Sequence, residues 1–176
     1  MRGPYQILLP LLGLFFCRVD LTDLYPLSFK VNLIKVYDGD TVLLSKGNYQ
    51  FKLRISKIDS PEKGQTTFAS KMDGGIYSRD CLKRILGREK VLEVHVFGID
   101  IYRRYLGDIN KVSLKMIEEG CAGLYPLATF NSKNEMFIYL KALKLARNQS
   151  RGLYRYGGFM QPRKWRKINK RFVRRQ

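Results

Sequence analysis

Between residues 28 and 58, the chain alternates three strand-like runs with two tight turns. The runs read SFKVNLIKVY, TVLLS and YQFKLRISKI, and the separators read DGD and KGN. Runs rich in β-branched and aromatic residues, joined by Gly, Asp and Asn, indicate strands connected by turns. Residues 28–58 are therefore expected to form three tightly connected strands.

The third run alternates apolar with polar side chains. Its apolar members are Phe51, Leu53 and Ile55. Arg54 belongs to the polar set, so it points away from the apolar face, whereas the same alternation would place Asp59 on the apolar side. For Arg54 and Asp59 to share a site, the strand must end, twist or bulge near Ile58.

The rest of the chain predicts two more strands and three helices. Strands are expected over 90–97 and 103–109, and helices over 76–86, 112–120 and 132–148, with Ser132 as a cap and Glu135 completing a capping box. The apolar spacing of Phe137, Leu140, Leu143 and Leu145 is expected to build core. His95 is expected to be a half-buried strand residue. Five short strands with helices indicate an α+β fold: a five-stranded oligonucleotide-binding (OB) barrel with three helices packed on it.

The charge is strongly positive and unevenly placed. The chain has 33 Lys and Arg against 15 Asp and Glu, a net charge of +18, and its hydrophobic fraction of 45% argues against a disordered chain. Such a surface favours a polyanionic partner. Residues 147–176 hold eleven basic side chains and no acidic one. We expect three parts: a leader (1–27), a folded domain (28–155) and a basic tail (156–176).

The aromatic residues near the end of the chain have two interpretations. They are Tyr154, Tyr156, Phe159, Trp165 and Phe172. Interleaved with Arg and Lys, they suit phosphate contact combined with base stacking. Alternatively, they anchor the segment by packing.

The N-terminus carries an apolar run from Ile7 to Cys17. Eleven residues are too few for a transmembrane helix, which takes about 20, but they match a secretory leader in length. We expect export, so that the protein is secreted, periplasmic or membrane-attached, and leave cleavage open. Cys81 and Cys121 either pair or stay as buried thiols, and no C-x-x-C motif or His/Cys cluster accompanies them to indicate a zinc site.

Two acidic turns follow neighbouring strands. Asp40 lies in the DGD turn, and IDSPE brings Asp59 and Glu62 after the third strand. Oxygen ligands of this kind suit a hard cation such as calcium, which would leave Glu62 to activate water. Arg54 and one arginine of DIYRRYLGDI could meet phosphate oxygens. Together these residue types suit phosphodiester cleavage.

From about Phe29 to Tyr154 the chain resembles the staphylococcal nuclease (thermonuclease) family. The resemblance rests on VYDGDTVLL, LRISKIDSPE, DIYRRYLGDI, EEGCAGLY and a closing helix into RGLY. It implies that Asp40 and Asp59 bind calcium through their side chains and Ser60 through its backbone carbonyl. It also implies catalytic roles for Arg54, Glu62 and Arg104.

The chain departs from the family pattern at one turn. The family has Asp-x-Tyr-Gly-Arg where this chain has Arg103 in the glycine position, which would reshape the turn if the backbone there needs a positive φ. Tyr102 and Tyr125 match substrate-contacting tyrosines.

The implied activity is calcium-dependent, endonucleolytic hydrolysis of DNA and RNA with low sequence specificity, leaving 3′-phosphates. Single-stranded substrate fits such a barrel groove better than a rigid duplex. We expect a monomer whose partner is nucleic acid. The alternatives are a catalytically inactive nucleic-acid-binding OB-fold protein and a basic protein that binds membrane lipids.

Overall fold

A closed five-stranded barrel forms the centre of the fold. The computed structural model describes residues 27–87 and 91–169. The barrel strands are β1 (Leu27–Val36), β2 (Thr41–Lys46), β3 (Tyr49–Ile55), β5 (Val91–Ile99) and β6 (Tyr105–Ile109), in the order β1-β2-β3-β6-β5. All neighbours are antiparallel except β3 and β6, which run parallel. The predicted α+β class and OB-like barrel are confirmed.

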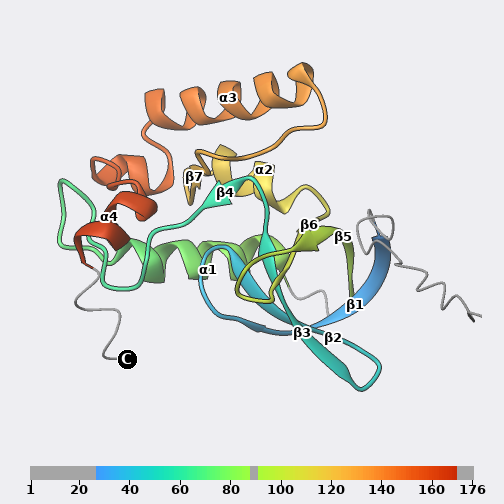
Figure 1. The fold of residues 1–176 in the computed structure, drawn as a ribbon. Coiled ribbons are helices and arrows are strands. Elements are labelled where there is room, and N and C mark those ends of the chain that lie inside the picture. Colours follow the sequence, from blue (N-terminus) through green and yellow to red (C-terminus); the bar gives the residue numbers. More distant parts are fainter. Residues whose placement is uncertain (1–26, 88–90, 170–176) are drawn as a thin grey trace, which may run out of the picture.

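Helices cover one side of the barrel (Figure 1). They are α1 (Gly74–Leu86), α2 (Val112–Glu118), α3 (Lys133–Asn148) and α4 (Pro162–Ile168), with a 3₁₀ turn at Gly152–Tyr156. Three of the four were expected. The fourth, α4, lies within the segment that the sequence presented as a basic tail, and its first helical residue is a buried proline, which suits that position.

The third barrel strand ends where the site requires it. β3 stops at Ile55, and Lys57 adopts a left-handed conformation with φ 67°. The chain then forms β4 (Ile58–Asp59), which pairs with β7 (Gly123–Leu124) in a separate two-stranded sheet. The predicted break near Ile58 is confirmed, and it carries Asp59 out of the barrel wall.

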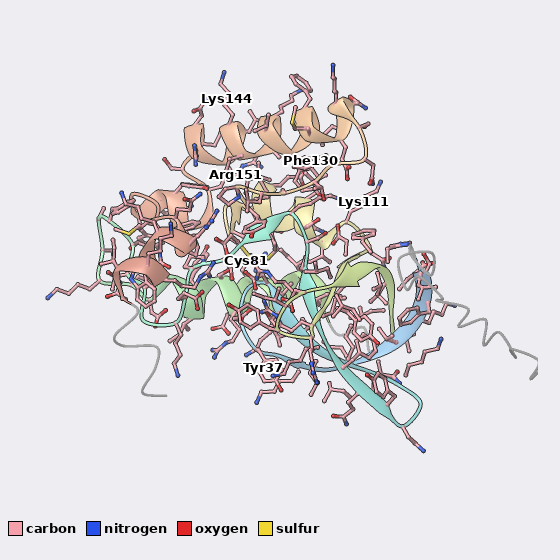
Figure 2. The ribbon with its side chains drawn as sticks, in the orientation of Figure 1. Tyr37, Cys81, Lys111, Phe130, Lys144 and Arg151 are labelled. Carbon is pink, nitrogen blue, oxygen red and sulfur yellow. A yellow bond between two sulfur atoms is a disulfide. The ribbon has the colours of Figure 1, made fainter. Side chains whose placement is uncertain are left out.

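The α3 helix buries a different face from the one expected. Phe137, Leu140 and Leu145 are exposed, whereas Tyr139, Ala142 and Ala146 are buried. The core prediction for the first three was wrong because α3 packs on α2 rather than on the barrel. Figure 2 shows Lys144 on the outer side of α3.

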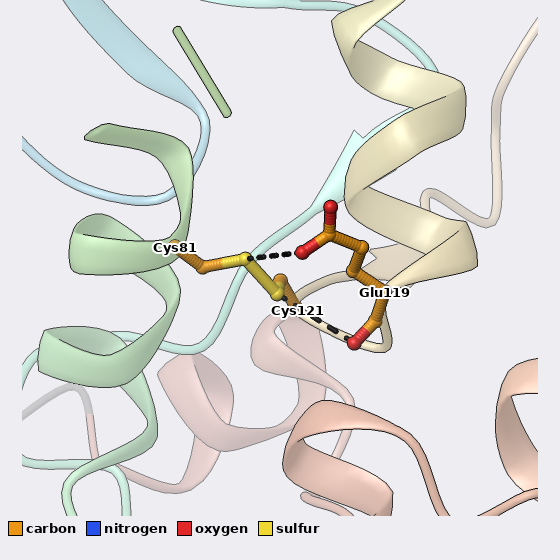
Figure 3. Close-up of side chains that lie close together, drawn as sticks. All are labelled: Cys81, Glu119 and Cys121. Carbon is orange, nitrogen blue, oxygen red and sulfur yellow. Dashed lines mark hydrogen bonds between the residues drawn. A yellow bond between two sulfur atoms is a disulfide. The ribbon is translucent and has the colours of Figure 1, made fainter. Parts of the chain in front are cut away.

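Cys81 and Cys121 form a disulfide (Figure 3). Cys81 lies on α1 and Cys121 follows α2, so the bond ties two helices together across 40 residues of sequence. Beside it, Arg84 and Glu119 form an ion pair of 2.6 Å. The sequence left open whether the two cysteines form a disulfide or stay as buried thiols, and in the structure they form the disulfide.

Two sequence predictions lie outside the described residues. The apolar run of the leader and Phe172 both fall there. Among residues 27–87 and 91–169, no helix has the length and apolar character needed to cross a bilayer.

Candidate active site

The two aspartates of the DGD turn differ in role: Asp38 stabilises the turn, and Asp40 belongs to the candidate site. The Asp38 side chain accepts a hydrogen bond of 2.9 Å from the backbone N–H of Asp40. Gly39 is required by close packing, since a Cβ there would lie 1.9 Å from the Ser78 hydroxyl oxygen. The turn therefore presses against α1, and Asp40 is buried with 4% of its surface exposed.

Arg54 joins the two aspartates of the site. Its Nη1 donates to Asp40 Oδ1, and its Nη2 lies 3.2 Å from Asp59 Oδ1. The Nη2 group also donates to the carbonyl of Ile58 at 3.3 Å. Arg54 thus faces the break between β3 and β4, where the two aspartates converge although 19 positions separate them.

Ser60 supports Asp40 through two hydrogen bonds. Its backbone N–H and its hydroxyl each donate to Asp40 Oδ2 at 3.0 Å. Ser60 is buried next to Asp40. The structure adds that the serine side chain itself orients the aspartate.

The protonation of the aspartates depends on burial and on the arginines. Burial and the neighbouring Asp40 carboxylate raise the pKa of Asp38 to about 7. Burial also opposes ionisation of Asp40, but the Arg54 charge and the Ser60 N–H outweigh it and hold its pKa below the ordinary value. For Asp59, burial dominates and raises the pKa, although the Arg166 guanidinium acts against it.

The buried carboxylates fit a cation. Within residues 27–87 and 91–169, no hydrogen-bond donor reaches the buried Oδ2 of Asp59. A buried carboxylate oxygen normally has a partner, because burying a charge without one is costly. A hard cation shared by Asp40 and Asp59 would satisfy it, and the all-oxygen donor set suits calcium.

Glu62 lies beside this pair on the loop between β4 and α1. Its backbone N–H donates to the Gln65 side chain at 3.1 Å. Its carboxylate pairs with Arg166 of α4, whose Nη2 also lies 3.3 Å from Asp59 Oδ1. Sequence reasoning missed Arg166, because a single arginine in a run of basic residues carries no positional signal.

Arg104 reaches the site from the turn before β6. Its Nη2 lies 2.7 Å from Asp100 Oδ2, and its Nη1 lies 3.4 Å from the Thr41 hydroxyl, which donates to Asp40. Arg103 keeps a left-handed conformation with φ 59°. Arg103 therefore adopts the left-handed backbone conformation that glycine favours, although it carries a side chain.

The two predicted substrate tyrosines each lie near a different arginine. The Tyr125 ring centre is 5.8 Å from the Arg54 guanidinium, and both residues line an open pocket of about 440 Å³. Tyr102 is 73% exposed, and its ring centre is 5.4 Å from the Arg104 guanidinium. The structure thus brings Tyr125 into the site and leaves Tyr102 at its edge.

Three aromatic residues near the chain end act as packing anchors. Tyr154 stacks on Phe159, with ring centres 6.0 Å apart. Tyr156 meets Tyr77 of α1 edge to face at 6.5 Å. These contacts favour the packing interpretation for these residues.

Comparison with known proteins identifies relatives over most of the chain. Residues 52–156 match the family described as staphylococcal nuclease homologue. A protein of Haemophilus influenzae named "Uncharacterized endonuclease" is 31% identical over 143 residues, which is 78% of this chain and 73% of that protein. The "Micrococcal nuclease" of Shigella flexneri is 27% identical over 81% of this chain and 83% of its own length. An "Uncharacterized endonuclease" of Escherichia coli O157:H7 is 29% identical over 76% of this chain and 82% of that protein.

Proposed function

The chain belongs to the staphylococcal nuclease family, and we propose that it is a calcium-dependent endonuclease hydrolysing DNA and RNA with low sequence specificity. The observation that carries this proposal is the convergence of three carboxylates and two arginines. Arg54 pairs with Asp40 and Asp59 where β3 ends, and Arg166 links Asp59 to Glu62. A carboxylate cluster with arginines is the arrangement that phosphodiester hydrolysis needs.

Each residue has a defined task in this proposal. Asp40 and Asp59 would hold calcium together with the Ser60 carbonyl, and the ion would neutralise charge on the phosphate. Glu62 accepts a proton from the attacking water. Arg54 and Arg104 bind phosphate oxygens, whose charge grows as the bond to the 5′ oxygen breaks. The 5′ oxygen takes up a proton from solvent and leaves as a hydroxyl, and the other product carries a 3′-phosphate.

The substrate is a flexible, single-stranded nucleic acid in this proposal. Phosphate contacts carry no sequence information, which supports low specificity. The pocket beside Arg54 and Tyr125 offers an aromatic ring next to the phosphate-binding group, and such rings stack on bases without sequence preference. Tyr102 would contact substrate at the edge of the site.

We further propose that the protein is an exported monomer that is secreted, periplasmic or attached to the membrane through its N-terminal segment. The disulfide between Cys81 and Cys121 supports an oxidising compartment, because such bonds are rare in the cytosol. Calcium is plentiful outside cells, which suits a site with only two side-chain carboxylate ligands.

Cleavage assays test the activity. The wild type should cut single-stranded DNA and RNA in calcium and stop when a chelator is added. Glu62→Gln should lose at least about a hundredfold in kcat, because general-base catalysis contributes that much. The matched control is Glu93→Gln, an exposed residue of β5, which should cleave normally. Salt-sensitive binding without any cleavage would instead favour the inactive, nucleic-acid-binding alternative.

Thermal unfolding tests the metal site without relying on activity. Calcium should raise the unfolding temperature of the wild type, because a ligand that binds only the native state stabilises it. Asp59→Asn should abolish this shift, and Glu93→Gln should keep it. A calcium shift that survives in Asp59→Asn would contradict the ligand assignment.

A further inference from the structure

The C-terminal segment is docked firmly on the loop that carries Glu62. The backbone N–H of Phe68 donates to the Gly158 carbonyl at 3.0 Å, and that of Ala69 donates to the Tyr156 carbonyl at 2.9 Å. Pro162, at the start of α4, is buried. In Figure 1, α4 lies against the long loop that leads into α1. The segment is therefore part of the folded domain.

A buried glutamine links this segment directly to the catalytic glutamate. Gln65 is 1% exposed; its Nε2 donates to the Met160 carbonyl, and its Oε1 accepts from the backbone N–H of Glu62. A buried amide bonded at both ends fixes the distance between the groups it joins. The position of α4 relative to Glu62 is thus built into the fold.

From this position α4 delivers Arg166 to the carboxylates. Its guanidinium pairs with Glu62 Oε1 and lies 3.3 Å from Asp59 Oδ1. Arg54 approaches the same Asp59 oxygen at 3.2 Å. Two arginines that are 112 positions apart in the sequence therefore converge on one carboxylate oxygen.

The two arginines differ in their freedom to meet a ligand. The Arg54 side chain is 14% exposed and is held by the buried Asp40. The side chains of Arg166 and Glu62 are each 37% exposed. An ion pair open to water is weak, so either partner can be exchanged at low cost. Arg166 can accordingly leave the glutamate for an incoming anion.

Resting on the nuclease function proposed above, we propose that Arg166 is a third phosphate-binding arginine of the active site, supplied by the C-terminal segment. Without substrate, its charge is balanced by Glu62 and Asp59. When substrate binds, a phosphate oxygen replaces the glutamate as its partner, and this frees Glu62 for the attacking water. The C-terminal segment then contributes to substrate binding at the point of cleavage.

Binding of a short, uncleavable ligand tests this role. The probe is a 5′-phosphorylated dinucleotide whose bridging 5′ oxygen is replaced by methylene, which keeps the charge and removes the scissile bond. Affinity is measured by calorimetry in calcium. The short probe can reach few positions outside the active site, which excludes general attraction to the basic surface.

We expect Arg166→Gln to weaken binding about tenfold or more, because a charge-assisted hydrogen bond contributes at least that much. Arg166→Lys keeps the charge but lacks the planar guanidinium, so its affinity for the dinucleotide should lie between those of the wild type and Arg166→Gln. Arg163→Gln, exposed on the same helix, is the control and should change affinity less than about twofold, because salt screens distant surface charges. Thermal unfolding checks that α4 stays folded in every variant.

The outcomes separate the two proposals. If wild type binds the dinucleotide and Arg166→Gln binds it equally well or more tightly, Arg166 is no phosphate ligand; tighter binding would make it an inhibitory counter-ion. If wild type neither binds the dinucleotide nor cleaves nucleic acid, the proposed function falls, and this inference falls with it.

Discussion

Arg54 lies 3.2 Å from the Asp59 carboxylate, although Arg54 stands in the barrel and Asp59 in the separate two-stranded sheet. The same arginine pairs with buried Asp40. Arg54→Ala should therefore lower the free energy of unfolding by about 3 kcal/mol, since it leaves the buried Asp40 carboxylate without its ion-pair partner. Urea denaturation without metal measures the loss.

The control for this substitution is Arg79→Ala. Arg79 forms an exposed ion pair of 3.0 Å with Asp80, which should contribute less than about 1 kcal/mol. Saturating calcium should restore part of the stability of Arg54→Ala, because a cation replaces the missing charge. Equal losses in the two variants would contradict the central role given to Arg54.

Replacing Arg103 by glycine should stabilise the protein. Arg103 has φ 59°, a conformation that costs a residue with a Cβ about 1 kcal/mol. Arg103→Gly should regain most of this energy, whereas Arg103→Ala keeps the Cβ and should not. The comparison is made by urea denaturation of the three proteins. Identical midpoints for the glycine and alanine variants would argue against strain at this turn.

Breaking the disulfide should destabilise the fold. The Cys81–Cys121 bond closes a loop of 40 residues and should contribute about 3 to 4 kcal/mol by restricting the unfolded chain. The double variant with Cys81→Ser and Cys121→Ser should unfold at a lower urea concentration than the wild type. A reducing agent should not change the unfolding midpoint of this variant. A wild type that is equally insensitive to reductant would show that the pair is not formed in solution.

The Glu135 carboxylate should contribute to stability only above the acid range. Burial opposes its ionisation, but the Lys57 ammonium, 2.7 Å away, and the Asn131 N–H lower its pKa below the ordinary 4.5. A lowered carboxyl pKa stabilises the native state above the unfolded value and loses that effect as the pH falls through the folded value.

Glu135→Gln should accordingly be less stable than the wild type at neutral pH, with the difference shrinking as the pH falls below 4.5. Denaturation at a series of pH values measures it. The exposed Glu93→Gln variant should follow the wild type throughout. A difference that grows toward acid would reverse the sign of the argument.

The barrel and the carboxylates could be predicted from the sequence because their signals are local. Alternation in β3 and the Asp-Gly-Asp turn depend on neighbouring residues only. The break after Ile55 could also be predicted from side-chain alternation. An unbroken strand would place Arg54 and Asp59 on opposite faces, where they could not meet. Local periodicity is weaker evidence for burial: α3 carries an apolar stripe that includes Phe137, yet it buries the face of Ala142 and Ala146 against α2.

The sequence by itself therefore determined the strands, the turns and the acidic residues at the strand ends, because side-chain alternation and turn chemistry act over a few residues. Only the tertiary structure decided that Cys81 meets Cys121 and that Arg166 reaches Glu62, 104 positions away. Contacts between residues so far apart in the sequence depend on how the helices, strands and loops pack against one another. Docking of the C-terminal segment on the loop around Gln65 is what brings one arginine of a basic run into contact with Glu62 and Asp59.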